Sequence, residues 1–424
     1  MKRILGLAHL TTYGIGMIVG AGIYSVIGQA AGVAGETVWL SFIIAGIAAF
    51  LTALSYAELS SMFPRTGAEY TYLKSIFPQL PLLAFMCGSM MVFAGACTAA
   101  TVATAFSGYL HEVLGVHVAG AAFMIVLVFS LLNIWGLKEA TWINMSFTAL
   151  EVIGLFIFIF LGLKSPHFGE NISLQVNSGT ISGAAMIIFA YFGFENIVNF
   201  AEETREPEKK LPRAIILSLL ASSFLYVLVS FAALGLATPA ELAKTNGPLS
   251  AVLKNEYAKA ALVIGAIAMF STANTILISI LSTSRVIFSM SREQDLPQIL
   301  SRLSKKRETP WVATLALFSL TSLLLPAGGI KIMASASSFA TMSAFILINL
   351  ALIHLRFVRP DLKRPFRIPG NIGLLPLIPT LAVLISFSLM FFYEIEVYFL
   401  TFSFLAFVFI LYLFRDHLKK GILK

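Results

Sequence analysis

The sequence predicts an all-α membrane protein of about twelve transmembrane helices. Of its 424 residues, 58% are hydrophobic and only 12% are charged, whereas a soluble domain typically carries about 25% charged residues. A membrane-spanning helix needs roughly 20 mainly apolar residues, and such stretches recur from Leu7 to Phe414 with only short polar breaks. We therefore expect a lipid bilayer to surround the chain.

The spans follow one another without room for a soluble domain, so residues 1–424 are expected to form a single transmembrane domain. The first span is expected to be retained rather than cleaved as a signal peptide, because its apolar run continues to about Ala31 and another span follows at once. The expected spans are residues 8–32, 37–62, 80–110, 117–136, 142–163, 181–202, 212–236, 258–288, 312–326, 331–356, 374–393 and 396–415.

The basic residues predict the orientation of these spans. Cytoplasmic loops carry an excess of Lys and Arg, and with an even number of spans both termini are expected in the cytoplasm of a multi-pass cell-membrane protein. Despite the formal charge of +8, no nucleic-acid partner is expected, because the basic residues lie in short connectors and form no separate basic domain. On this topology, all 29 Lys and Arg residues fall on the cytoplasmic side except Lys164, Lys244, Lys254, Lys259 and Lys331.

Glycines interrupt spans one and six. Span one contains Gly14, Gly16, Gly20 and Gly22, and span six contains Gly193 among bulky residues. One interpretation is that small residues let helices approach closely, as in a small-xxx-small pattern. The other is that both helices are broken, since spans one and six correspond if spans 1–5 and 6–10 are inverted repeats, and paired breaks of this kind indicate a transporter site.

Unwinding at mid-membrane would free backbone groups that hydrocarbon cannot satisfy. A half-helix beginning near Ala21 would offer N–H donors and a positive dipole end to a carboxylate. Carbonyl groups near Ile18 and Phe189 would accept hydrogen bonds from an ammonium group. An amino acid zwitterion fits both ends, so we expect an amino acid substrate.

Five segments resemble, in order, motifs of the amino acid, polyamine and organocation (APC) transporter superfamily, in particular its amino acid permeases. The most specific is FAYFGFENIVNFAEETREPEKKLPRAI at 189–215, the exit of span six. A departure occurs at Gly67-Ala68, where the family usually has two adjacent glycines. The other segments are GIGMIVGAGIYS (14–25), AELSSMFPRTGAEYTYL (57–73), SRVIFSMSREQDLP (284–297) and RPDLKRPFRIPG (359–370).

The resemblance implies a LeuT-type core of two inverted five-helix repeats, at 1–163 and 181–357, with two accessory helices at 374–415. It implies alternating access around a mid-membrane site, with one large aromatic of span six acting as a lid. No cofactor and no metal site is implied. The positions that match substrate contacts of the family are Ile18, Ala21, Gly22, Phe189, Phe192 and Gly193.

Two acids within predicted spans stand out, Glu151 and Glu195, because a carboxylate in the membrane is costly and therefore indicates function. Cationic amino acid transporters of the family also carry a carboxylate at the position of Glu195, and some relatives have a lysine in place of a sodium ion at the position of Glu151. We expect one or both acids to bind the coupling proton, because burial favours the neutral form. Alternatively, they cap freed N–H groups or pair with Asn144, Asn196 or Asn274.

Two further interpretations remain open at this stage. The hydroxyl-rich eighth span, with Ser279, Ser282, Thr283 and Ser284, offers oxygen ligands for sodium, although such hydroxyls usually bond back to their own helix. The stretch 202–206 is either a solvated helix exit or a cytoplasmic gate that pairs with basic loop residues such as Arg65.

The sequence thus predicts secondary active transport of amino acids by proton symport or exchange. The alternatives are a cationic amino acid or polyamine antiporter, and a membrane amino acid sensor that does not transport. An enzyme is not expected, because the sequence has no HExxH or GxSxG motif and no paired cysteines. Side-chain specificity and oligomeric state are left open.

Overall fold

The computed structural model describes residues 3–114, 120–244, 247–254, 257–326, 330–391 and 393–421. Over these residues the chain is mainly helical, and two short strands pair antiparallel with Asn371 opposite Pro376 and Ile372 opposite Leu375. The elements are α1 (Leu7–Ala34), η1 (Gly35–Thr37), α2 (Val38–Met62), α3 (Ala68–Ile76), α4 (Pro81–Leu114), α5 (Ala121–Trp135), α6 (Leu137–Leu163), α7 (Ser178–Ile187), η2 (Ile188–Tyr191), η3 (Phe194–Glu203), α8 (Pro207–Leu236), α9 (Pro239–Ala243), α10 (Pro248–Ala251), α11 (Ala258–Arg292), η4 (Gln298–Ser301), α12 (Trp311–Leu324), α13 (Ile330–Val358), β1 (Asn371–Ile372), β2 (Leu375–Pro376), α14 (Leu377–Met390) and α15 (Ile395–Gly421).

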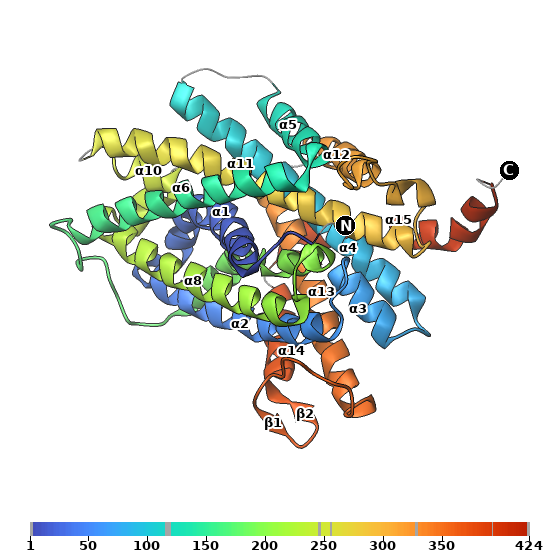
Figure 1. Ribbon diagram of the computed structural model, residues 1–424. Coiled ribbons are helices and arrows are strands. Elements are labelled where there is room, and N and C mark those ends of the chain that lie inside the picture. The colour runs from blue at the N-terminus through green and yellow to red at the C-terminus, as the bar shows by residue number, and fades with distance from the viewer. Residues whose placement is uncertain are drawn as a thin grey trace.

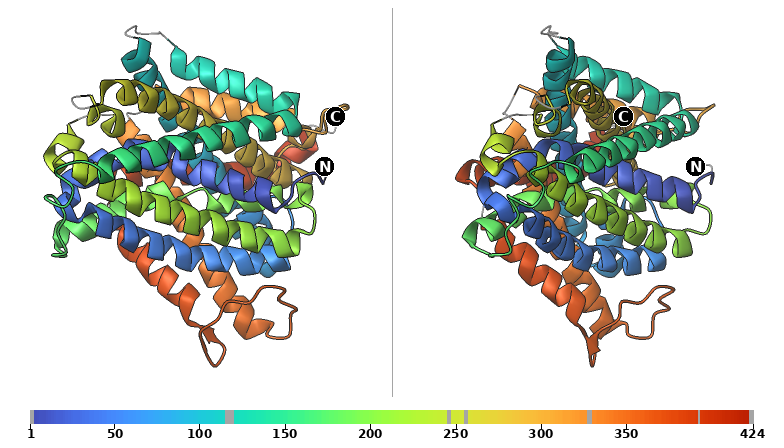
Figure 2. Two further views of the ribbon diagram at one scale, coloured as in Figure 1. Left: turned by 60° about the vertical axis from the view of Figure 1, so that its left-hand side comes forward. Right: turned by 90° about the vertical axis from the view of Figure 1, so that its left-hand side faces the viewer.

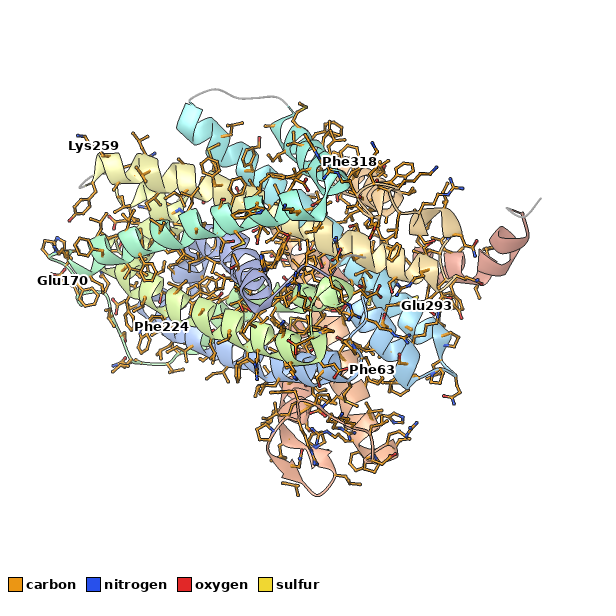
Figure 3. All side chains as sticks on the ribbon, in the orientation of Figure 1. Phe63, Glu170, Phe224, Lys259, Glu293 and Phe318 are labelled. Atoms are coloured by element: carbon orange, nitrogen blue, oxygen red, sulfur yellow. The ribbon has the colours of Figure 1, made fainter. Side chains whose placement is uncertain are left out.

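The described chain has nine segments that are long and apolar enough to cross a membrane, and three shorter apolar helices, α5, α12 and α14. Many large apolar side chains on these helices are exposed, as lipid-facing residues should be. In Figure 3, Phe224 and Phe318 lie at the periphery of the bundle. The prediction of a multi-pass α-helical membrane protein is confirmed.

Helix α1 lies at the centre of the bundle, where it packs against α6, α7, α8 and α11 (Figure 1). Around it, α2 packs along α8, and α4 packs against both α11 and α13. Helix α15 lies outside this core, against α13 and α4. The central position of α1 requires small side chains, which its six glycines supply.

The connectors lie on the two sides that the charge pattern predicts to be opposite. In Figure 3, Glu170, from a connector predicted outside the cell, and Lys259, at the start of α11, lie toward one side. Phe63 and Glu293, from connectors predicted in the cytoplasm, lie toward the other. Helix α1 begins and α15 ends at the same end of the bundle (Figure 2).

Candidate functional site

The helix expected over residues 181–202 is interrupted at its middle. The α-helix α7 gives way to the 3-10 turn η2, and 3-10 geometry resumes in η3. Between them Phe192 is extended and Gly193 has φ 132°, a region that side chains rarely tolerate. A Cβ at Gly193 would also lie 2.7 Å from Met17 Cγ of α1. Glycine therefore permits both the break and the contact with α1, and the predicted interruption of span six is confirmed.

Neighbouring side chains satisfy the broken backbone. The Gly193 N–H donates to Glu195 Oε2 at 2.8 Å, and Asn196 Nδ2 donates to Glu195 Oε1 at 3.0 Å. The Tyr226 hydroxyl of α8 lies 2.8 Å from the carbonyl oxygen of Ala190. These partners matter because an unpaired backbone group in the membrane costs several kcal/mol. Glu195 thus caps a freed N–H, a role also considered for it from the sequence.

The interruption expected in span one is absent. Helix α1 runs as continuous α-helix from Leu7 to Ala34, so the prediction of a half-helix that begins near Ala21 and offers free N–H groups is wrong. The carbonyls of Ile18 and Gly20 remain in this helix and accept further hydrogen bonds from the Tyr226 and Ser271 hydroxyls.

The glycines of α1 serve close packing instead. A Cβ at Gly16 would lie 2.6 Å from Asn274 Nδ2, and a Cβ at Gly22 would lie 2.8 Å from Ala190 Cα in the broken segment. Both separations are closer than side chains permit, so larger residues would push α11 or η2 away. The close-approach interpretation of this glycine pattern is the correct one.

A cavity of about 30 Å³ lies between α1, α4, the broken segment, α11 and α13. It has room for roughly two water molecules, so it must enlarge before an amino acid can enter. Its walls include the predicted Ile18, Gly22, Phe189, Phe192 and Glu195. The other lining residues are Met17, Met91, Ala94, Gly95, Thr98, Asn196, Thr275, Ser279, Thr283, Ser337 and Thr341.

Two predicted positions stand apart from these walls. Gly193 lies behind the cavity wall, against Met17. Ala21 has its backbone in α1, but its side chain lies outside the described residues.

The hydroxyl groups of the wall were missed as a set, although their spacing is a usable signal. Thr275, Ser279 and Thr283 recur every four residues, as do Ser337 and Thr341. Residues four apart lie on one face of a helix. Polar rows of this kind on otherwise apolar spans indicate a shared polar surface.

Glu151 does not line the cavity. It is buried on α6, where it accepts a hydrogen bond from the Ser271 hydroxyl of α11. Asn144 and Asn274 lie nearby on the same two helices and bond to each other at 3.0 Å. Among the described residues, neither Glu151 nor Glu195 forms an ion pair with a basic side chain.

Three of the four hydroxyls considered as sodium ligands have other hydrogen-bond partners. Ser282 donates to Asn196 at 2.5 Å, Ser279 donates to the Gly95 carbonyl at 3.0 Å, and Ser284 bonds back to Leu281 of its own helix.

The acidic exit of η3 is tied to α11 by two ion pairs. Glu203 forms a bidentate pair with Arg285 at 2.7 and 2.8 Å, and both side chains are buried. Glu202 pairs with Arg292 in the same way, at 2.7 and 2.8 Å, but nearer the surface. The expected partner, Arg65, is exposed. The pairing with Arg65 is therefore wrong, because the chain brings the end of α11 and not the loop arginine against these acids.

Comparison with known proteins matches this chain to a family described as "Amino acid permease" over residues 5–414. It is 33% identical to the branched-chain amino acid permease BcaP of Bacillus subtilis, over 92% of this chain and 88% of the relative. It is 29% identical to the methylthioribose transporter of the same organism, with the same coverage of 92% and 88%. A third relative, the vacuolar cationic amino acid transporter 2 of Arabidopsis thaliana, is 29% identical over 85% of this chain and 61% of its own length. All three relatives are transporters rather than enzymes.

Proposed function

Because this chain belongs to the amino acid permease family, we propose that it moves amino acids across the cell membrane by secondary active transport with alternating access. The observation that supports this most strongly is the broken segment 188–193, whose residues form one wall of a cavity at the centre of the bundle. Irregular backbone at membrane depth is tolerated where it is buried in protein or lines a cavity.

We assign the finer architecture on the same grounds. The three shorter apolar helices complete a set of twelve spans, with both termini in the cytoplasm. Residues 1–163 and 181–357 form two inverted repeats of LeuT type, and residues 374–415 supply two accessory helices. The break in the second repeat faces an unbroken α1 in the first, so the two repeats differ in this closed conformation.

The substrate is a neutral amino acid with an apolar side chain. The cavity wall carries Met17, Ile18, Met91, Phe189 and Phe192, which suit an aliphatic side chain. The relative at 33% identity bears the name of a branched-chain amino acid permease.

In this assignment Ile18, Ala21, Gly22, Phe189, Phe192 and Gly193 form the substrate site. The Phe189 ring is half-buried and meets the Phe192 ring edge to face at 6.1 Å. Rotation of these rings would enlarge the cavity, and either can then close over the substrate as a lid.

A cationic substrate is the second candidate, because Glu195 lies in the wall. Both of its carboxylate oxygens already accept hydrogen bonds, which favours the neutral substrate. Competition between leucine and lysine for uptake separates the two.

We assign the coupling proton to Glu195, Glu151 or both. Each is buried without a basic partner among the described residues, and an unpaired carboxylate there favours protonation. Replacing each with Gln keeps its shape and removes the charge. Uptake driven by a pH gradient should fall while exchange at equal pH persists; unchanged gradient-driven uptake would remove that residue from the coupling mechanism.

The deciding experiment is uptake by the purified protein in liposomes against a panel of amino acids and polyamines. Gradients of protons, sodium and counter-substrate are imposed in turn. We expect uptake of branched-chain amino acids, stimulated by an inward proton gradient. Binding without uptake under any gradient would indicate a sensor, and sodium-dependent uptake would overturn the proton assignment.

A further inference from the structure

Another buried acid, Glu69, lies outside the membrane-spanning segments, in the short helix α3 that follows α2. Its side chain is fully buried, and its Oε1 accepts a hydrogen bond from the Tyr56 hydroxyl at 2.9 Å. Its Oε2 has no hydrogen-bond partner among the described residues. A buried carboxylate with an unpaired oxygen is strongly disfavoured, so this environment favours the protonated acid.

Aromatic rings separate Glu69 from the cavity. The Tyr56 ring packs edge to face against Phe194 and Phe345, each at 5.6 Å between centroids. Phe345 in turn meets Phe192, a cavity wall residue, at 5.4 Å.

Residues of helix α4 also indicate where Glu69 lies relative to the cavity. Met91 lines the cavity, and Cys87, one helical turn nearer the start of α4, lies within electrostatic range of Glu69. Glu69 therefore lies on the side of the cavity toward the end of the bundle predicted to face the cytoplasm.

The residues just before Glu69 belong to the contact that closes this end. The Thr66 carbonyl accepts from Ser289 of α11 at 2.9 Å, and the Gly67 N–H donates to Asn199 of η3 at 3.2 Å. Separation of α3 from η3 and α11 breaks these bonds and lets water reach Glu69.

Few titratable groups face this carboxyl. Lys74 and Asp295 bond to Tyr70 on another face of α3, and His354 stacks on Phe77 at its end. Among the described residues, groups that interact electrostatically with Glu69 include Tyr56 of α2, Tyr72 of α3, Cys87 of α4 and Glu195 of η3. None of these is a cation, and an ionised Glu195 would further oppose ionisation of Glu69.

We propose that Glu69 is a proton-binding residue of the transport cycle, which holds a proton while the cytoplasmic end is closed and releases it to water when that end opens. This inference rests on the proposed proton coupling and adds the residue through which the proton leaves. Only the O–H bond of the Glu69 carboxyl breaks, and the proton passes to water.

The sign of the pH dependence follows from burial. Burial raises the pKa of the Glu69 carboxyl from 4.5 to about 7 in the closed protein. Opening hydrates the group and returns its pKa toward 4.5, so the open state loses its proton at lower pH than the closed state. Raising the pH from 5 to 8 should therefore favour opening, on the order of 50-fold from these two pKa values.

The native Cys87 reports this opening. In a Cys97→Ala background it is the only cysteine of the chain, and it is buried beside Glu69 when the end is closed. Its rate of labelling by N-ethylmaleimide is measured from pH 5 to 8 without substrate. The same background with Glu69→Gln corrects for the pH dependence of the thiol itself.

Between pH 5 and pH 8 the labelling rate of the Glu69 protein should increase by some factor, and that factor should be more than ten times the factor for the Gln variant. Parallel profiles would overturn the proposal. A second variant, Tyr56→Phe, removes the hydrogen bond that lowers the pKa of Glu69, so the labelling transition should move to higher pH. An unmoved transition counts equally against a proton-binding role, and this variant serves if Glu69→Gln folds poorly.

The labelling assay and the transport assay distinguish a failure of the Glu69 proposal from a failure of the proposed function. If the wild-type protein shows no amino acid uptake in liposomes, the proposed function fails whatever the labelling profile. If uptake is proton-driven and Glu69→Gln retains both that stimulation and the wild-type labelling profile, only the role of Glu69 fails.

Discussion

Replacing Glu203 with Gln tests whether the buried pair with Arg285 holds the end of the bundle closed. The two side chains are 4% and 1% exposed and make two hydrogen bonds at 2.7 and 2.8 Å. The guanidinium also lies over the Phe200 ring at 5.1 Å. Glutamine keeps the shape of the site but leaves the cation of Arg285 buried without a counter-charge.

The expected cost is about 3–5 kcal/mol, the range for breaking a buried pair on one side. That corresponds to a shift of roughly 100-fold or more in the equilibrium between closed and open forms. Glu202→Gln is the matched control, because its pair with Arg292 is 23% and 38% exposed. A pair of that kind contributes about 0–1 kcal/mol.

Thermal unfolding of the purified protein measures the loss of stability, and cysteine labelling at pH 7 measures the shift toward the open form. Glu203→Gln should lower the unfolding midpoint and raise labelling of Cys87, and adding Arg285→Met should restore part of both. If Glu203→Gln and Glu202→Gln have equal, small effects, burial does not give the Glu203 pair its strength and the argument is wrong.

Two further changes test the broken segment. Gly193→Ala places a Cβ 2.7 Å from Met17 Cγ at a φ of 132°. Backbone strain and crowding together should lower the free energy of unfolding by roughly 2–5 kcal/mol. An unchanged unfolding midpoint would contradict the close contact. Tyr226→Phe removes the hydroxyl that donates hydrogen bonds to the Ala190 and Ile18 carbonyls. We expect the free energy of unfolding to fall by about 1–3 kcal/mol and uptake to slow. A variant within about 0.5 kcal/mol of wild type would show that those carbonyls need no donor.

The long apolar runs made the helical fold predictable, but the glycine pattern alone could not distinguish a break from close packing. At Gly193, bulky neighbours and a following Glu-Asn pair accompany a real break. At Gly16 and Gly22 the same residue type sits in unbroken helix, because Asn274 and Ala190 occupy the space that a side chain would need. Those partners lie more than 160 residues away in sequence.

Only part of the candidate site was predictable, because some of its contacts also join residues that are far apart in sequence. Phe189, Phe192 and Glu195 were identified from the segment that breaks, and they do line the cavity. The choice of Arg285 over Arg65 as the partner of Glu203 depends on how α11 packs against η3, which no local pattern records. Glu69 lies in the segment 57–73, whose residue pattern does not indicate that this carboxyl is buried.

The most direct test of the central claim is a structure of the protein with a bound branched-chain amino acid. We predict ligand density between Ile18 of α1 and Phe189 of the broken segment, in an enlarged form of the same cavity. Density anywhere else, with residues 188–193 unchanged and the cavity empty, would contradict the assignment of this break as the substrate site.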